Sequence, residues 1–208
     1  KVYYLQYSTY IFSQKMKSSC DNFELCGTTH EFRKRYRPAH GQDDWLNSSK
    51  ILGSNGWDQF QLLFVDPSDT LHAVSKDKFY KGPLPNGENW LRDTATCIGS
   101  GAWGQFKFLF FHPNGELYGV TNSGLFFKGP PPTHAGDNWI GRATQIGTSG
   151  WSDAQFLFFH PNGDLYGVWK DAFYKDSPPT CPTDNWSARC TCIGTAGWAE
   201  FRQLFFDP

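Results

Sequence analysis

The chain has 208 residues, a net charge of −1 at pH 7 and an aromatic content of 18%, with nine Trp, 21 Gly and 13 Pro. This balanced charge disfavours a general nucleic-acid or membrane-surface binder, because such proteins carry a basic excess. No stretch approaches the roughly 20 apolar residues of a membrane span, so we expect no membrane insertion.

Residues 1–24 are left over once the repeats described below are assigned, and we separate them as a divergent N-terminal segment from one domain at residues 25–208. Residues 1–10 are aromatic and polar, without the apolar core or small-residue cleavage site of a signal peptide. If the protein is secreted, we expect this sequence to be its mature form.

The domain is built from a repeat whose most apolar part is a predicted strand ending at Pro. Its copies are residues 60–67 (FQLLFVDP), 106–113 (FKFLFFHP), 154–161 (AQFLFFHP) and 201–208 (FRQLFFDP). The run at 106–111 is apolar at both alternating sets of positions, so it predicts a strand buried on both sides. Asn114-Gly115 follows, and this dipeptide predicts a hairpin with a type I′ turn.

Three further short strands are predicted in each repeat. The second lies at 71–74 (LHAV), 117–120 (LYGV) and 165–168 (LYGV), and the third at 78–81 (KFYK), 125–128 (LFFK) and 172–175 (AFYK). A Pro-rich break ends the pairing, because Pro lacks the hydrogen-bond donor. The fourth strand is more polar and ends at Ile-Gly or Leu-Gly, so we expect it to lie outermost and partly in contact with water.

Two Trp residues recur in every repeat. The first follows an Asp or Asn, which we expect to cap a turn, and is predicted to anchor the core or a blade interface: Trp45, Trp90, Trp139 and Trp186. The second lies in a Gly-rich loop and fits either packing or ligand contact. It occurs at Trp57, Trp103, Trp151 and Trp198, at spacings of 46, 48 and 47 residues. Trp169 has no counterpart, and we expect it to serve local packing.

Four short strands in about 47 residues are typical of a propeller blade. No repeat shows the 3.6-residue period of a helix. We therefore predict an all-β fold, a β-propeller of ~47-residue four-stranded blades with four recognisable blades.

The N-terminal end of the domain departs from the repeat. Residues 25–28 (LCGT) and 32–36 (FRKRY) are predicted as degenerate second and third strands. The ring could close by pairing residues 201–208 with the strand at Leu25. Residues 10–13 fit an eroded inner strand of a partial fifth blade, and residues 1–24 fit equally a cap, a plug or an extended arm.

The six cysteines permit disulfides, but no spacing completes a zinc site, so no metal is expected. They are Cys20, Cys26, Cys97, Cys181, Cys190 and Cys192. Two glycosylation sequons, Asn47-Ser48-Ser49 and Asn185-Trp186-Ser187, are compatible with a secreted, extracellular protein.

The repeat resembles that of the tachylectin-2-like lectin family over residues 41–208, and more loosely over 25–40. Its consensus here is DNW…RAT.IG..GW..F.FLFF.PNG.LYGV…FYKG.PP. The resemblance implies a five-bladed propeller that binds N-acetylglucosamine or N-acetylgalactosamine without metal or other cofactor. This chain has four such motifs where the family has five. A five-bladed form, with residues 1–24 as a degenerate partial blade, is therefore the alternative fold.

The resemblance places sugar sites between adjacent blades, at the Gly-rich Trp loop and at the segment that leaves the inner strand. Glycine lets backbone groups approach a sugar closely, and an aromatic ring can cover its apolar face. Ala102 stands where other repeats have Gly, so the second site is expected to be the weakest. The predicted sugar-binding residues are Gly56, Trp57, Asp66, Trp103, His112, Asn114, Gly150, Trp151, His160, Asn162, Gly197 and Trp198.

We therefore predict a lectin, in innate immune recognition or agglutination, whose weak equivalent sites act together on glycoproteins, glycolipids or microbial surfaces. A homo-oligomer is compatible with this function. An enzyme is disfavoured, because catalytic groups should be unique and here the polar features recur in each repeat. A propeller scaffold for protein–protein interaction without sugar binding is the alternative.

Overall fold

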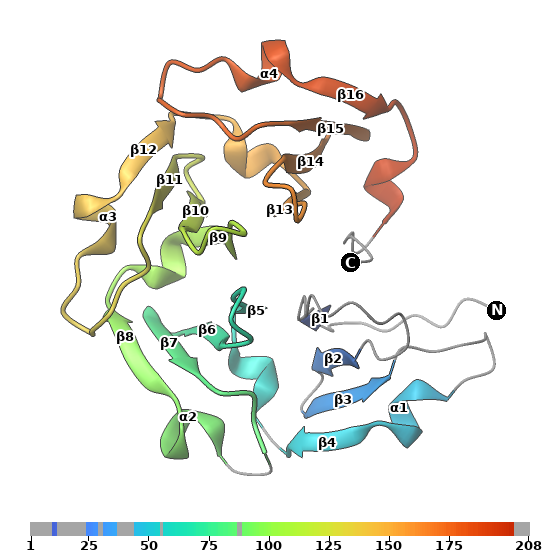
Figure 1. Cartoon of the computed structure of the whole chain (residues 1–208), viewed down its shortest axis with the longest axis vertical. Helices are drawn as coiled ribbons and strands as arrows, with labels where there is room; N and C mark the ends of the chain where they lie inside the picture. The colour runs from blue at the N-terminus through green and yellow to red at the C-terminus, as the bar shows by residue number, and fades with distance from the viewer. Residues whose placement is uncertain are drawn as a thin grey trace. The chain divides into compact units, whose positions relative to one another are not determined.

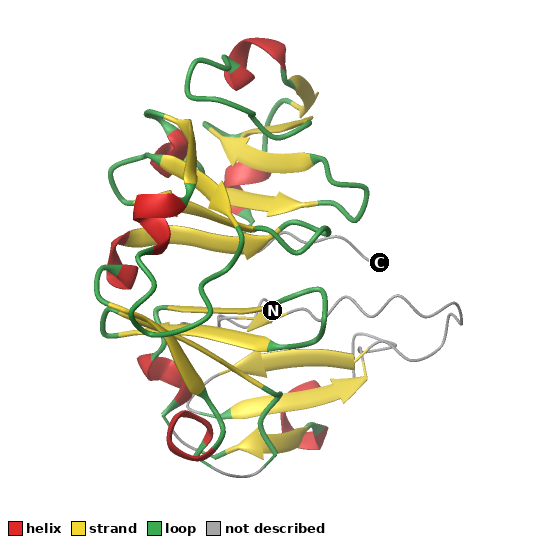
Figure 2. Ribbon diagram, turned by 60° about the vertical axis from the view of Figure 1, so that its left-hand side comes forward, coloured by secondary structure: helices red, strands yellow, loops and turns green. Residues whose placement is uncertain are grey.

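The computed structural model describes residues 10–11, 24–28, 31–36, 44–54, 56–86 and 89–201. The chain divides into two compact units, Lys1–Gly104 with His134–Gly136, and Gln105–Thr133 with Asp137–Pro208. Strands dominate both units, and each helix is a single turn (Figure 2). None of the helices in the described ranges is long and apolar enough to cross a membrane.

The first unit holds two antiparallel four-stranded sheets, blade 1 and blade 2, with strand orders β1-β2-β3-β4 and β5-β6-β7-β8. Blade 1 consists of β1 (Tyr10–Ile11), β2 (Glu24–Thr28), β3 (Phe32–Tyr36), the one-turn helix α1 (Trp45–Ser48) and β4 (Lys50–Gly53). The 3₁₀ turn η1 (Trp57–Gln59) leads into blade 2, which consists of β5 (Leu62–Val65), β6 (Leu71–Ser75), β7 (Lys78–Gly82), α2 (Trp90–Asp93) and β8 (Thr96–Ser100). The 3₁₀ turn η2 (Trp103–Gln105) follows blade 2.

The second unit holds blade 3 and blade 4, with orders β12-β11-β10-β9 and β13-β14-β15-β16 (Figure 1). Blade 3 consists of β9 (Phe106–Phe111), β10 (Leu117–Thr121), β11 (Phe126–Gly129), α3 (Trp139–Arg142) and β12 (Thr144–Gly147). After η3 (Trp151–Asp153), blade 4 consists of β13 (Phe156–Phe159), β14 (Leu165–Trp169), β15 (Ala172–Asp176), α4 (Trp186–Arg189) and β16 (Thr191–Gly194), and η4 (Trp198–Glu200) follows.

The N-terminal strand β1 completes blade 1, so residues 10–11 do not begin a fifth blade. Tyr10 pairs with Gly27, and Ile11 pairs with Cys26. Blade 1 therefore extends beyond the domain boundary predicted at residue 25. The sequence predicted that residues 201–208 would pair with β2, and β1 pairs with β2 at this edge instead. Residues 202–208 lie outside the described residues. The pairing of β2 with β3 was predicted and is confirmed.

The hairpin between β9 and β10 is confirmed, but its predicted turn type is wrong. Only Gly115 has a positive φ, at 88°, and its N–H donates to the carbonyl of His112. This geometry is a type I turn followed by a left-handed Gly, which also suits a hairpin. Two-residue turns with both φ values positive occur instead between β6 and β7, at Lys76-Asp77, and between β14 and β15, at Lys170-Asp171.

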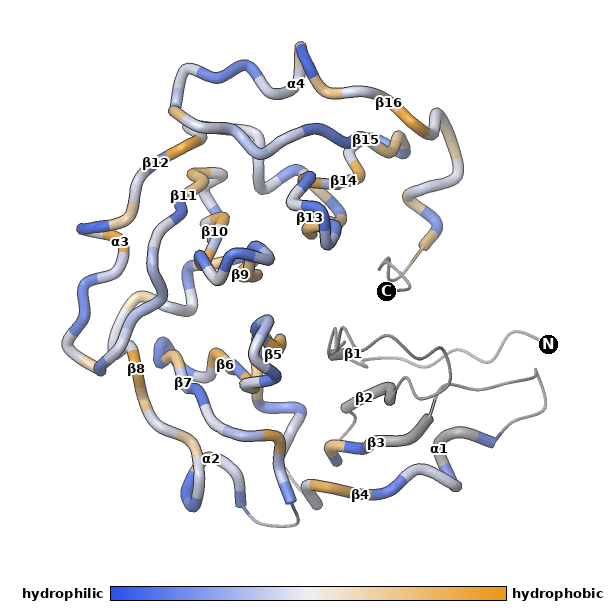
Figure 3. Tube along the Cα trace, viewed as in Figure 1, coloured by the Kyte–Doolittle hydropathy of each residue, from blue (hydrophilic) through white to orange (hydrophobic). Residues whose placement is uncertain are grey.

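The prediction that the β9 run is buried on both sides is wrong. Only Phe106 and Leu109 of β9 are buried, whereas all five residues of β10 are. β9 is an edge strand with one neighbour, while β10 lies between β9 and β11. The fourth strands are partly exposed, as expected, and their hydrophobic stretches appear in Figure 3.

The predicted anchoring role of the first repeated Trp is confirmed where that Trp is described, and the predicted capping role of the residue before it is confirmed in three of the four blades. Trp90, Trp139 and Trp186 are buried, and each indole N–H donates to a backbone carbonyl of the preceding loop, that of Pro83, Pro130 or Ser177. The residue before the Trp caps three of the helices through its side chain: Asp44, Asn89 and Asn138. Asn185 makes no such bond.

A side chain at the start of each of three blades donates to a carbonyl of the 3₁₀ turn that follows the blade. Gln61 Nε2 lies 3.0 Å from Gly104 O, and Lys107 Nζ lies 2.6 Å from Ser152 O. Gln155 Nε2 lies 2.8 Å from Ala199 O. These bonds fix the entry to the next repeat.

Candidate functional site

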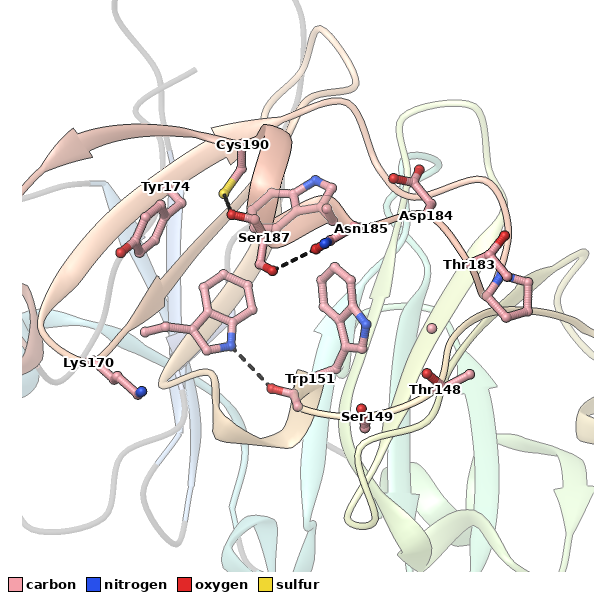
Figure 4. A pocket seen from close by; sticks show the side chains of 15 residues that line it. Thr148, Ser149, Trp151, Lys170, Tyr174, Thr183, Asp184, Asn185, Ser187 and Cys190 are labelled. Carbon is pink, nitrogen blue, oxygen red and sulfur yellow. Dashed lines mark hydrogen bonds between the residues drawn. The ribbon is translucent and has the colours of Figure 1, made fainter.

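A cavity of about 500 Å³ opens in the second unit, between the loop that leaves β12 and the outer part of blade 4 (Figure 4). Three segments line it. They are the Gly-rich loop at residues 147–151, the β14–β15 corner with Trp169, Lys170 and Tyr174, and residues 182–187 with Cys190. The volume lies within the range of small-ligand pockets, about 300–1,000 Å³.

Three indole rings form the apolar part of the cavity. The ring centroids of Trp151 and Trp169 are 5.9 Å apart, and Trp186 lies 5.5 Å from Trp151 and 5.4 Å from Trp169. The rings are inclined to one another by 46–74°. Trp151 is 8% exposed and Trp186 4%, while Trp169 is half-buried. Trp169 therefore offers the most ring surface to a ligand.

The position of Trp151 depends on two glycines of its loop. Gly150 adopts the left-handed conformation, with φ 78°, and lets the chain enter η3. At Gly147 an added Cβ would lie 2.2 Å from Trp151 Nε1, so the indole packs directly on the backbone of β12. These contacts explain why the loop carries Gly at both positions.

Trp169 was predicted to serve local packing, and the structure places it in the cavity wall as well. Its Nε1 donates to the carbonyl of Gly150 at 3.3 Å. A Cβ at Gly167 would lie 2.2 Å from its ring, so that Gly leaves room for the indole. The corresponding residues of blades 2 and 3 are Ser75 and Thr121. Only this break in the repeat could have marked Trp169 from the sequence.

Polar groups surround the indoles. Thr148, Ser149, Asn185 and Ser187 are exposed along the cavity, and their hydroxyl and amide groups can bond a ligand. Lys170 is the cation at its edge. Among the thiols of the described residues, Cys97, Cys181, Cys190 and Cys192 are free.

The acidic group of the cavity is neutralised by a neighbour. Arg189 donates to both carboxylate oxygens of Asp184, at 2.9 and 3.0 Å. These bonds lower the pKa of Asp184 below its usual value, against the smaller opposing effect of burial. Arg189 also pairs with Asp176 at 3.0 Å. Asp184 therefore stays ionised and shapes the wall at residues 183–187.

We expect Asp184→Asn to lower stability at neutral pH by less than about 1 kcal/mol, because the pair lies at the protein surface, with the Arg189 side chain 33% and the Asp184 side chain 15% exposed. The folded-state pKa is depressed, so the contribution is present above the unfolded-state value of about 3.9 and is lost as the pH falls through the folded-state pKa. Urea midpoints at pH 3 to 8 check this. The difference between the native chain and the variant should be constant from pH 8 to about 5 and close below about 4. A pH-independent difference would contradict it.

The predicted turn residues do not line this cavity. Trp151 precedes β13 and His160 follows it, so one strand of four residues, about 13 Å, separates the loop from the turn. Asn162 Oδ1 accepts the N–H of Asp164 at 3.0 Å, and the N–H of Asn162 donates to His160 Nδ1 at 3.1 Å. Both side chains thus order their own turn.

The equivalent turns of the other blades have the same internal bonds. In blade 3 the N–H of Asn114 donates to His112 Nδ1 at 3.1 Å, and Asn114 Oδ1 accepts the N–H of Glu116 at 3.0 Å. In blade 2 Asp66 accepts from the N–H groups of Ser68 and Thr70. A sugar contact at Asp66, His112, Asn114, His160 or Asn162 stays a prediction.

The other predicted loop residues repeat the Gly147–Trp151 geometry in their own places. Gly56 and Gly197 have φ values of 79° and 82°, and Ala102 adopts 66°, which is strained for a residue with a Cβ. Trp57 and Trp103 are buried, with Trp57 at 4.8 Å from Phe32 and Trp103 at 4.4 Å from Phe79. Trp198 is half-buried against Phe173 at 4.4 Å. These rings are at least partly structural.

The repeated sheets define a β-propeller protein, and its cavity lies between two successive blades. A model of the Tachylectin family matches residues 27–208, and the chain belongs to this family of lectins, which are generally not enzymes.

A solved protein described as "The de novo evolutionary emergence of a symmetrical protein is shaped by folding constraints" is similar to this chain, with a TM-score of 0.80 and 44% identity. The match covers 85% of this chain and 75% of that one. The Chaetomium thermophilum Nup82 NTD-Nup159 TAIL-Nup145N APD complex matches at a TM-score of 0.39 and 14% identity, over 80% of this chain and 43% of that one. That likeness carries no argument. No curated protein matches the chain.

Proposed function

We propose that the protein binds terminal N-acetylglucosamine or N-acetylgalactosamine, and that the cavity between blades 3 and 4 is one of its sites. The observation that carries the proposal is the cluster of Trp151, Trp169 and Trp186 beside a Gly-rich loop, in a chain of a lectin family. The partners would be N-acetylated sugars on glycoproteins, glycolipids or microbial surfaces, outside the cell.

The chemistry of the wall suits such a sugar. An acetyl methyl group and the apolar face of a pyranose ring can pack against the exposed side of Trp169. The acetamido group and the ring hydroxyls need donors and acceptors, which Ser149, Asn185 and Ser187 supply. Each sugar hydroxyl needs a hydrogen-bond partner in the bound state, because burying a polar group without one weakens binding.

Repetition of the loop supports a multivalent mode of binding. One monosaccharide offers few contacts, so a single site should be weak, and sites that act together on a dense surface gain about 10²–10⁴ in avidity. The third indole, that of Trp169, belongs to blade 4. Blade 2 has Ser75 and blade 3 has Thr121 at the corresponding position. The sites are therefore expected to be unequal, with agglutination or immune recognition depending on their sum.

The test is Trp169→Thr, which places in blade 4 the residue that blade 3 has at this position. We expect the variant to stay folded and to lose at least about tenfold in affinity for N-acetylglucosamine, equivalent to 1.4 kcal/mol or more. Isothermal titration or a Trp-fluorescence titration measures this, with glucose, which lacks the acetamido group, as the control ligand.

Two outcomes would overturn the proposal. The first is a flat response of the chain, made in a bacterial host that adds no glycan, to all N-acetylated sugars on a glycan array, which would favour a protein-binding scaffold. The second is equal binding of glucose and N-acetylglucosamine, or unchanged affinity in Trp169→Thr, which would place recognition outside this cavity.

A further inference from the structure

The N-cap position of the one-turn helices differs in blade 4 from the other blades. Asp44, Asn89 and Asn138 cap α1, α2 and α3, and the second residue after each is Leu46, Leu91 or Ile140. In α4 the cap residue is Asn185 and the second residue after it is Ser187. Only blade 4 thus has a glycosylation sequon at this place in the repeat.

Asn185 also does not make the capping hydrogen bond that its counterparts in the other blades make. Its side chain accepts no backbone N–H of α4, and instead Oδ1 accepts a hydrogen bond from Ser187 Oγ at 2.9 Å. Its Nδ2 donates no hydrogen bond within the described residues, and the side chain is exposed. A substituent on Nδ2 would therefore break no hydrogen bond among the described residues.

In the other sequon, Asn47-Ser48-Ser49, the side-chain nitrogen of the Asn is already hydrogen-bonded. Asn47 Nδ2 donates to Asp44 Oδ2 at 2.7 Å, and the backbone N–H of Asn47 donates to Asp44 Oδ1 at 3.2 Å. A glycan on Asn47 would crowd the bond by which Asp44 and Asn47 close the first turn of α1. The geometry thus separates two sequons that look alike in the sequence.

Asn185 is also a wall residue of the cavity, as Figure 4 shows, next to the three indoles. We propose that Asn185 is an N-glycosylation site and that its glycan covers the cavity, so that the glycosylated chain has this sugar site closed. The covering function rests on the sugar binding proposed above, whereas the modification itself does not.

The modification is a substitution at carbon. Asn185 Nδ2 attacks C1 of the reducing-end N-acetylglucosamine of an oligosaccharide carried on a lipid diphosphate. The N–C1 bond forms, the bond from C1 to the diphosphate oxygen breaks, and the lipid diphosphate leaves with the electron pair. The amide nitrogen loses one proton and keeps one, and no oxidant or reductant takes part.

Its consequence follows from the size and place of the product. A glycan is bulky and hydrated. Its first sugar would be tethered within reach of Trp169 and Ser187, so it excludes an external sugar by its volume and competes with it at a high effective concentration. Blades whose cap residue lies outside a sequon would be unaffected.

The first experiment measures occupancy. The chain with Asn47→Gln is made in a eukaryotic secretory host, and peptide mass spectrometry reads the peptide that contains Asn185. We expect a glycan on most molecules, its loss in Ser187→Ala and its retention in Ser187→Thr. An unmodified Asn185 in the secreted chain overturns the proposal.

The second experiment measures coverage in the same Asn47→Gln chain, made with the glycan in the secretory host and without it in a bacterial host that adds none, so that Asn185 stays an amide in both. Absence of the glycan should raise the affinity for N-acetylglucosamine by about tenfold or more, equivalent to 1.4 kcal/mol. It should also speed the reaction of a bulky thiol reagent with Cys190 in the cavity, relative to exposed Cys192.

The thiol readout needs no sugar binding, so it separates the two proposals. Unchanged Cys190 reactivity in the chain without the glycan overturns the covering function. A rise in Cys190 reactivity with no sugar binding by either form supports the covering glycan and overturns the proposed function.

Discussion

Replacing Gly147 by alanine is expected to lower the free energy of unfolding by about 2–3 kcal/mol, as overpacking of a close-packed site does. The new Cβ would lie 2.2 Å from Trp151 Nε1 and 3.0 Å from Phe126 Cβ. Trp151 cannot yield freely, because its ring is packed 4.6 Å from Phe126 and 5.5 Å from Trp186. Ligand binding at the cavity should be lost with the displaced indole.

Gly129→Ala is the matched control for this prediction. It lies in the same blade, and its added Cβ would meet Ala143 Cα at 3.5 Å, an ordinary contact. We expect a change within about 1 kcal/mol, because this buried site has room for the methyl group and Ala is about 0.5–1 kcal/mol less costly than Gly within a strand. Urea denaturation of both variants gives the comparison. Equal midpoints for Gly147→Ala and Gly129→Ala would show that the Trp151 loop adapts and would contradict the packing argument.

The second large effect is expected at Trp139, where replacement by alanine should cost about 3–5 kcal/mol, the range for a buried aromatic residue. Trp139 is 1% exposed, its Nε1 donates to Pro130 O at 2.9 Å, and its ring meets Phe106 edge-on at 5.8 Å. Such a loss is a large part of the stability of a typical domain, about 5–15 kcal/mol.

Two variants test the cause. Trp139→Phe should lose less, because a ring still fills the site and the carbonyl of Pro130 still accepts from Arg142 Nη1 at 3.0 Å. Trp169→Thr, at a half-buried ring, should cost less than about 1.5 kcal/mol. Thermal unfolding of the three variants gives the order. Equal losses for Trp139→Ala and Trp169→Thr would mean that burial does not set the effect.

The fold could be predicted from the sequence because the same pattern of strands and turns occurs several times in the chain. Each copy places a strand, a Gly-containing turn and a Trp at the same spacing, so the element types and the four-stranded blade follow from local pattern. The turns at Lys76-Asp77 and Lys170-Asp171 were not predicted, since the Lys-Asp dipeptide lacks the Gly that marks a two-residue hairpin turn in the sequence. Their cause is tertiary: Asp171 accepts the N–H groups of Gly197 and Ala199, and Asp77 accepts that of Gly104.

The candidate site was only partly predictable, for a different reason. Gly150 and Trp151 were found because they repeat, whereas Trp169 was assigned to packing because it does not. Its place in the cavity depends on how the β14–β15 corner meets the loop leaving β12, a contact between residues far apart in the chain. The residues His160 and Asn162 were joined to the loop by the family resemblance, and β13 separates them.

The side chains that reach from one repeat to the turn opening the next have a consequence for the history of such chains. Gln61, Lys107 and Gln155 occupy one register, and their acceptors Gly104, Ser152 and Ala199 occupy another. A recombination event that adds or deletes one whole repeat between equivalent positions leaves each of these three kinds of donor with an acceptor in the repeat that follows it. The number of blades can therefore change in a single genetic step without leaving an orphaned bond at the junction.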